Sequence, residues 1–332
     1  MRLKLPSLID PFLLFLIATV ATASIAPCRG EAAKITGDVT DAAIALLFFL
    51  HGAKLSRQAI LAGIGHWRLH LVVATSTFVL FPLLGLGVQA LGRGWMDPSI
   101  GAGLLFLCLL PSTVQSSIAF TSIAGGNVPA AVCSASASNL AGIFITPVLV
   151  GLLMGARSGG GVSAQSIEAI ALQLLAPFIL GHLSRPLTAK VLEQHKRVVN
   201  MVDRGSILMV VYSAFSAAVV QGLWSKLSAA DLGLVLALDA VVLGAALVAT
   251  TLAARLLGFS RQDEIAIVFC GSKKSLASGV PMAGVLFPAA MVGPIIVPLM
   301  LFHQMQLMVC AVLARRYAAG TPPAPEATSL KL

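Results

Sequence analysis

Runs of apolar residues, separated by single charges and short polar connections, extend along almost the whole chain. A run of about 20 apolar residues is long enough for an α-helix to cross the hydrocarbon core of a membrane. The second run is short unless it extends back toward residue 35, and residues 54–66 are predicted to form an interfacial helix on the membrane surface. The pattern thus predicts ten transmembrane helices, at residues 9–26, 41–52, 69–91, 100–124, 128–154, 167–187, 202–223, 232–257, 264–287 and 291–314.

The composition is that of a membrane protein. Of the 332 residues, 58% are hydrophobic and 11% are charged, whereas about 25% are charged in a typical soluble domain. A soluble enzyme and a disordered chain are therefore excluded. Ten helices leave room only for short connections and tails, so no large domain outside the membrane is expected.

The net charge of +9 indicates membrane topology rather than nucleic-acid binding, because the basic residues stand singly between apolar runs. With the N-terminus in the cytoplasm, fifteen of the 22 Lys and Arg residues fall on the cytoplasmic side and five on the other side. Positive residues are retained in the cytoplasm. This bias predicts an all-α polytopic protein of the cytoplasmic (inner) membrane, with both termini cytoplasmic.

The chain divides near a Gly- and Ser-rich connector at residues 155–161. The division predicts a first five-helix repeat at 1–157, a second at 158–318 and a flexible C-terminal tail at 319–332. Residues 115–119 resemble 273–277 at an offset of 158, and residues 128–131 resemble 287–290 at an offset of 159. Repeats with an odd number of helices lie in opposite orientations, so two inverted repeats are predicted.

The fourth and ninth predicted helices contain residues that interrupt a regular helix. These residues are Pro111, Ser112, Thr113, Gln115, Ser116, Ser117, Thr121 and Ser122 in the fourth, and Gly271, Ser272, Ser275, Ser278, Gly279 and Pro281 in the ninth. Backbone unwinds at membrane depth only where protein or a water-filled cavity satisfies its polar groups, and paired interruptions in two repeats are typical of a transport site. Ordinary proline kinks are the alternative. We expect broken helices 4 and 9 that cross.

Two adjacent lysines lie inside the ninth apolar run. Lys273 follows Asp263 by ten residues, which is about 15 Å of helix and half of the hydrocarbon thickness. Each buried lysine costs about 2.5–3.5 kcal/mol at that depth, so the pair indicates a function. Three roles are open for the lysines: they bind an anionic substrate, one of them carries a proton, or one of them pairs with a carboxylate. If the backbone there is helical, only one of them faces the crossing point, and the other reaches a water-filled vestibule.

Two further polar residues lie inside predicted helices. Asp239, in the eighth, is the candidate charge partner of Lys273 or Lys274, or a proton relay. His303, in the tenth, is a weaker candidate for a relay, because a hydrogen-bonded packing role is more usual for such a histidine. The alternative without a functional role is that the lysine side chains extend to the membrane surface.

Motifs of other functional classes are absent from the sequence. It contains no Walker-type phosphate loop, no H-E-x-x-H motif and no G-x-S-x-G motif, and no pore filter is visible. The five cysteines show no C-x-x-C spacing, so no metal site and no cofactor are expected. Secondary transport is the class that remains, rather than an enzyme.

Three segments carry a resemblance to a known family. Residues 269–277 (FCGSKKSLA), 125–128 (GGNV) and 51–56 (HGAKLS) resemble the bacterial SBF-like branch of the bile acid:sodium symporter superfamily. The resemblance covers nearly the whole chain. It implies a core of helices 3–5 and 8–10 and a panel of helices 1, 2, 6 and 7, with substrate between them and sodium behind the crossed helices.

The resemblance also implies site residues, with one departure. The first sodium site of the family corresponds approximately to Gln115, Ser116, Ser117, Ser134 and Ser138. Sodium-binding members supply a Glu and a Gln from the ninth helix, where this chain has Ser272-Lys273-Lys274-Ser275. An ammonium group repels sodium and has no lone pair to donate, so one lysine is expected to take the cation position, permanently or by protonation. The coupling ion is then Na⁺ or H⁺, with sodium in doubt.

The sequence therefore predicts a secondary active transporter that moves a small organic anion by alternating access within a lipid bilayer. The alternative is a non-transporting membrane regulator of the same fold that binds a lipid or a protein partner. The candidate substrate or ion-binding residues are Lys273, Lys274, Ser272, Ser275, Gln115, Ser116, Ser117, Asn127, Ser134 and Ser138, and the candidate charge partners or proton relays are Asp239 and His303.

Overall fold

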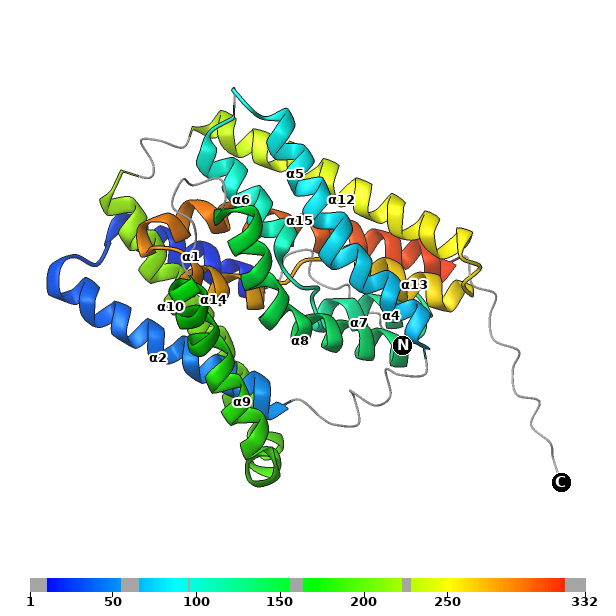
Figure 1. Cartoon of the computed structure of the whole chain (residues 1–332), viewed down its shortest axis with the longest axis horizontal. Helices are drawn as coiled ribbons and strands as arrows, with labels where there is room; N and C mark the ends of the chain where they lie inside the picture. Colours follow the sequence, from blue (N-terminus) through cyan, green and yellow to red (C-terminus); the bar gives the residue numbers. More distant parts are fainter. Residues whose placement is uncertain (1–10, 55–65, 95, 156–163, 223–227, 320–332) are drawn as a thin grey trace.

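The computed structural model describes residues 11–54, 66–94, 96–155, 164–222 and 228–319, which form helices joined by short turns (Figure 1). No β-strand occurs in these ranges. The helices are α1 (Pro11–Ile25), α2 (Gly30–Lys54), α4 (Trp67–Thr75), η2 (Ser76–Leu80), α5 (Phe81–Leu91), α6 (Pro98–Leu109), α7 (Gln115–Ile123), α8 (Val128–Leu153), α9 (Ala164–Gln194), α10 (Lys196–Val220), α12 (Ala229–Leu256), α13 (Arg261–Gly271), α14 (Leu276–Leu286) and α15 (Ala289–Ala319).

Each predicted apolar run contains helix in the structure, but several helices are longer than predicted. The largest difference is in α2, whose 25 residues begin at Gly30. Polar residues in its first turns hide this extension from a hydropathy reading. The predicted interfacial helix at 54–66, most of the connector at 155–161 and the tail at 319–332 lie outside the described residues.

Five helical segments are long and apolar enough to cross a membrane by length and composition. They are Trp67–Leu91, α8, α10, α12 and α15. Shorter apolar helices occur at Leu14–Ile25 and in α6. The described chain is thus a multi-pass, all-helical membrane protein.

Both predicted interruptions are present. The chain leaves helix between α6 and α7, where Leu110 has an extended backbone (φ −80°, ψ 157°). It leaves helix again between α13 and α14, where Ser275 is extended (φ −85°, ψ 110°) and caps α14 by accepting a hydrogen bond from Ser278 N. Pro111 lies within the first break, whereas Pro281 lies inside α14 without ending it. We name residues 110–114 the first break and residues 272–275 the second break.

A π-helical turn interrupts the third segment beside the second break. It is η2, which joins α4 to α5 without a turn. Ser76 Oγ in this turn donates a hydrogen bond to Gly271 O, at 2.7 Å. Single π-turns inside α-helices occur frequently at functional sites, because they change the direction of main-chain carbonyls.

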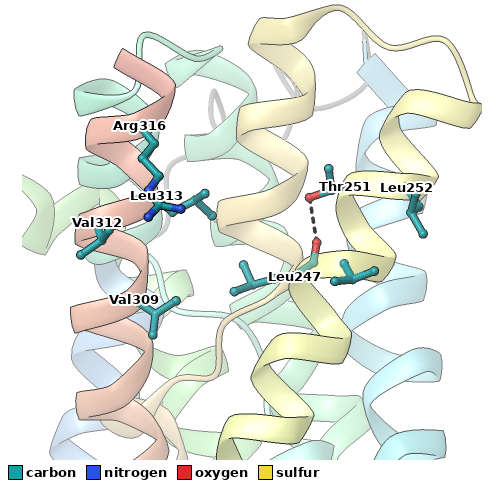
Figure 2. A pocket seen from close by; sticks show the side chains of 8 residues that line it. Leu247, Thr251, Leu252, Val309, Val312, Leu313 and Arg316 are labelled. Atoms are coloured by element: carbon teal, nitrogen blue, oxygen red, sulfur yellow. Dashed lines mark hydrogen bonds between the residues drawn. The ribbon is translucent and has the colours of Figure 1, made fainter. Parts of the chain in front are cut away.

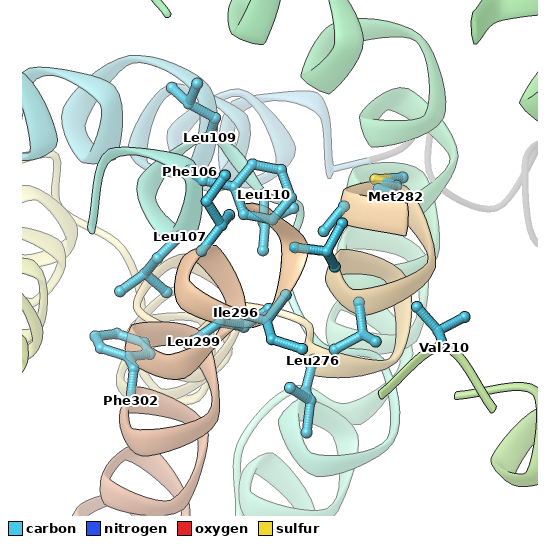
Figure 3. Packing of buried hydrophobic residues seen from close by; sticks show 14 of the residues in the cluster. Phe106, Leu107, Leu109, Leu110, Val210, Leu276, Met282, Ile296, Leu299 and Phe302 are labelled. Atoms are coloured by element: carbon cyan, nitrogen blue, oxygen red, sulfur yellow. The ribbon is translucent and has the colours of Figure 1, made fainter. Parts of the chain in front are cut away.

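Several pairs of helices pack along one another. On one side of the molecule α2 packs along α9, and α1 packs along α10 (Figure 1). The helix α10 also packs against α2 and α15, α6 packs against α15 and α5, and α12 packs against α13 and α15. Apolar side chains of α6, α14 and α15, among them Phe106, Leu276 and Leu299, interdigitate around the breaks (Figure 3).

The helices of the two chain halves follow one another in the same order and with similar spacing. In the second half α14 begins 161 positions after α7 (Leu276 against Gln115), and α15 begins 161 positions after α8 (Ala289 against Val128). The sequence matches, at offsets of 158 and 159, therefore lie two or three residues out of the register of the helices.

Candidate functional site

Hydrogen bonds join the two breaks. Ser112 Oγ donates to Cys270 O at 2.6 Å, and Ser117 Oγ donates to Phe269 O at 2.8 Å. In the opposite direction Ser275 N donates to Pro111 O at 2.9 Å. Each break thus satisfies main-chain groups that the other leaves without helical partners, as backbone at membrane depth requires.

Lys273 lies fully buried against α7. Its Nζ donates to Ser116 Oγ at 3.2 Å and lies 4.6 Å from the ring centre of Phe120 and 5.7 Å from that of Phe269. Aromatic faces at such distances attract a cation. The side chain therefore reaches a hydroxyl group and two rings rather than a carboxylate.

Lys274 is also fully buried, and its side chain extends to a different place. Its Nζ donates to three main-chain carbonyls, those of Thr77 (2.9 Å), Cys108 (3.0 Å) and Leu110 (2.6 Å). The ring centre of Phe81 lies 4.1 Å from the same nitrogen. We name the three carbonyls and this ring the Lys274 cage.

The prediction that one lysine reaches a water-filled vestibule is wrong for this structure, because neither lysine is exposed. Residues 272–275 are not helical, so the angle between neighbouring side chains on a helix does not apply there. The two ammonium groups diverge into separate surroundings. A lysine that extends to the membrane surface is likewise not found.

Gln306 of α15 holds the main chain of Lys274 from both sides. Lys274 N donates to Gln306 Oε1 at 2.9 Å, and Gln306 Nε2 donates to Lys274 O at 2.9 Å. The same Nε2 lies 2.9 Å from His303 Nδ1, which must accept because the amide nitrogen is a donor. Sequence reasoning missed Gln306. An amide one turn after His303, the second of two amides in an apolar helix, was the available signal.

Replacing Gln306 by leucine is expected to lower the free energy of unfolding by about 2–4 kcal/mol, because it leaves the buried N–H and C=O of Lys274 without partners. The matched control is Gln306→Glu, which keeps an acceptor for Lys274 N but loses the donor. We expect an intermediate loss for this control. Chemical unfolding of the purified variants measures both effects, and a leucine variant as stable as the wild type would contradict the role of this amide.

The other predicted residues divide into two sets. Near the breaks, Ser138 Oγ accepts from Ser112 N at 3.1 Å, and Ser272 Oγ donates to Val268 O at 2.6 Å. Gln115 and Ser116 line a cavity beside the breaks. Together with Lys273, Lys274, Ser117 and Ser275, these residues come together in the structure.

Asn127 and Ser134 lie apart from the lysines in their contacts. Asn127 caps α8 by accepting from Ala130 N, and its amide donates to Asp263 Oδ1 at 2.7 Å. Ser134 Oγ lies 2.6 Å from His70 Nδ1 of α4. Both contacts join helices, so the structure gives these two residues packing partners rather than a common site with the lysines.

Asp239 is fully buried in α12. Within the ranges given above, neither of its carboxylate oxygens has a hydrogen-bond partner, and it forms no salt bridge with a lysine. The Lys–Asp pair that the sequence left open is therefore not formed in this structure.

A cavity of about 530 Å³ lies where α2 and α10 face the starts of α7 and α14. Gln115, Ser116 and Ser275 contribute polar groups from the helix starts, and His303 contributes its ring from α15. The opposite wall holds the ion pair of Lys54 with Asp203, and Arg204. Sequence reasoning did not single out this wall, because its charges stand at the ends of helices and resemble topology signals.

A second, more open cavity of about 490 Å³ lies between α12 and α15 (Figure 2). Its lining is apolar except for Arg316 and Thr251, and the Thr251 hydroxyl donates to Leu247 O within the same helix. It contains no residue of either break. The cavity beside the breaks is therefore the better candidate for binding a polar ligand.

Sequence comparisons with known proteins identify relatives of the chain. A sequence model of the SBF-like CPA transporter family matches residues 10–319. An uncharacterised protein of Pseudomonas aeruginosa is 60% identical over 93% of both chains. "Putative symporter YfeH" of Escherichia coli is 55% identical over 96% of both chains. "Sodium/bile acid cotransporter 7" of Danio rerio is 28% identical over 83% of this chain and 82% of its own.

Proposed function

The chain belongs to the SBF-like CPA transporter family, and from this we propose that it is a secondary active transporter of a small organic anion. The transporter type is that of the bile acid:sodium symporters; one relative is named a putative symporter, and another is named a sodium/bile acid cotransporter. Transport proceeds by alternating access at the cavity beside the breaks. No catalytic step and no cofactor take part.

The observation that carries this proposal is the position of the cavity. Two helix N-termini, those of α7 and α14, open onto it, and each carries partial positive charge. Arg204 lies on the opposite wall, and Lys273 lies behind Ser116. Apolar side chains such as Leu140 and Phe178 complete the lining. A ligand with an acidic group and an apolar body suits such a lining.

The helix order supports a layout of ten membrane crossings in two inverted repeats. We place the first repeat at 1–157 and the second at 158–318, as the sequence predicts. The common spacing of α7 with α14, and of α8 with α15, favours this layout. The packing of α1, α2, α9 and α10 favours a panel of helices 1, 2, 6 and 7 against a core of helices 3–5 and 8–10. We place both termini in the cytoplasm and the protein in the inner membrane, on the distribution of Lys and Arg.

We further propose that transport does not require sodium. The second break supplies two ammonium groups and no carboxylate, and positive charge at this point repels a second cation. A proton gradient then drives the cycle. A non-transporting regulator remains the alternative reading of the same fold.

Uptake by reconstituted vesicles tests the function. Vesicles are loaded and diluted to impose a sodium or a proton gradient, and the entry of organic anions is measured for wild type and for Lys273→Gln. We expect uptake by the wild type without sodium, and a loss of about 10- to 150-fold in the variant, since a charge-assisted bond is worth about 1.5–3 kcal/mol. Lys196→Gln, at an exposed position of α10, is the control that should retain uptake.

Absence of uptake for every anion with either gradient, together with a stable partner recovered in pull-down, would favour the regulator. Uptake that needs sodium would overturn the coupling proposal alone. Uptake by Lys273→Gln at the wild-type rate would remove the lysine from the substrate site.

A further inference from the structure

We propose that the Lys274 cage is a monovalent cation site whose resident cation is the tethered ammonium, and that it binds a free ammonium-type or alkali cation when the side chain is shortened. Its role in coupling rests on the proposed transport function. The existence of the site does not, because it can be tested on purified protein without any measurement of flux.

The cage is built from carbonyls that the helix geometry leaves available. Cys108 and Leu110 lie at the end of α6, where the last carbonyls of a helix have no intrahelical partner and carry partial negative charge. Thr77 lies in η2, where the hydrogen-bond ladder changes register. The three oxygens therefore converge on one point from two separate segments of the chain, and each of them needs a donor or a cation.

The charge at this point is compensated as it is for an ion in a carbonyl-lined site. Among the residues that the structure describes, Lys274 forms no salt bridge with an Asp or Glu. Main-chain dipoles and the face of Phe81, at 4.1 Å, are the groups that surround the nitrogen. Carbonyl rings replace the hydration shell of cations in selective channels by the same physics.

The cage is separate from the cavity beside the breaks. Neither lysine lines that cavity, but Ser116, the partner of Lys273, does, whereas Thr77, Cys108 and Leu110 of the cage do not. The two lysines therefore have different roles in the proposal. Lys273 contributes to the substrate site, and the ammonium group of Lys274 occupies the cation site. Gln306 fixes the main chain of Lys274 on both sides, so truncating the side chain leaves position 274 in place beside the cage, whose oxygens belong to η2 and the end of α6.

The test uses purified Lys274→Ala protein in a buffer of constant ionic strength made with choline chloride. Melting temperature is measured while methylammonium, ammonium, potassium or sodium replaces choline. We expect a saturable rise in the melting temperature of Lys274→Ala with methylammonium or ammonium, and no rise for the wild type. Lys274→Met is the matched control, because its apolar side chain fills the same space and should show no response to any cation.

An equal response, or no response, in the alanine and methionine variants would overturn the proposal. A saturable effect of sodium on the wild type would also overturn it, because the resident ammonium should exclude a second cation. The Lys274→Ala variant could be recovered folded only when methylammonium is present during extraction, and this outcome would support the proposal. If Lys274→Met is recovered folded but no cation allows Lys274→Ala to be recovered folded, the proposal is contradicted. Cation binding by Lys274→Ala, together with no flux by the wild type, would support the cation site and contradict the proposed transport function.

Discussion

Gly181→Ala is expected to destabilise the protein by about 3 kcal/mol or more, which is at or beyond the upper end of ordinary overpacking. Gly181 of α9 lies against the main chain of α2, and a Cβ placed there would come 2.0 Å from Phe49 O. Real Cβ atoms essentially never approach another atom within 3.0 Å. The neighbouring atom is backbone and cannot rotate away, so the two helices must separate along their contact.

The contact is reciprocal, which makes the expected result specific. A Cβ at Gly52 of α2 would lie 2.0 Å from Phe178 O of α9, so Gly52→Ala should cause a similar loss. Gly205→Ala in α10 and Gly244→Ala in α12 are the controls, because no atom lies within 4 Å of a Cβ at either position. In a helix they should be neutral or stabilising by about 0.5–1 kcal/mol. Thermal melts in one detergent compare all four, and equal effects would contradict the close approach of α2 and α9.

Asp239→Leu is expected to raise the free energy of unfolding by about 1–3 kcal/mol, because it removes a fully buried carboxyl group whose oxygens lack partners. Asp239→Asn is the matched control. It keeps the shape and leaves a polar group without partners, so its stability should stay near that of the wild type. Chemical unfolding of the three proteins measures the difference.

The same variants test whether this carboxyl group carries a proton. If it does, both variants should lose proton-driven uptake, although only the leucine variant gains stability. Natural proteins accept such costs at functional sites. A leucine variant that is less stable than the wild type would show that the carboxyl group has a stabilising partner in the native protein.

The sequence was sufficient to predict the helical segments and their interruptions. Apolar runs of membrane-spanning length gave each helical region, and the residues around Pro111 and around Gly271 to Ser275 gave the two breaks. Burial of Lys273 and Lys274 was also predicted, from their distance along the chain to Asp263. These features depend on the period and length of apolar runs, which a single sequence records directly.

The partners of the lysines could not be predicted in the same way. The oxygens around Lys274 belong to the main chain, so the side chains of Thr77, Cys108 and Leu110 do not report them. The side chains instead pointed to Asp239, the only acid well inside a helix predicted from the sequence. It also grouped Ser134 and Asn127 with the lysines, although these residues join other helices.

The bonds between the two breaks determine where the molecule can move. If the two breaks separated, Ser112 and Ser117 would lose their acceptors on α13, and the Lys274 charge would lose its carbonyls in hydrocarbon. The boundary between α10 and the helices α14 and α15 is different, because apolar side chains such as Val210 and Leu276 pack there and can slide past one another. In the proposed transport cycle the two breaks would thus travel together as one rigid body, with the hinges lying at its margins.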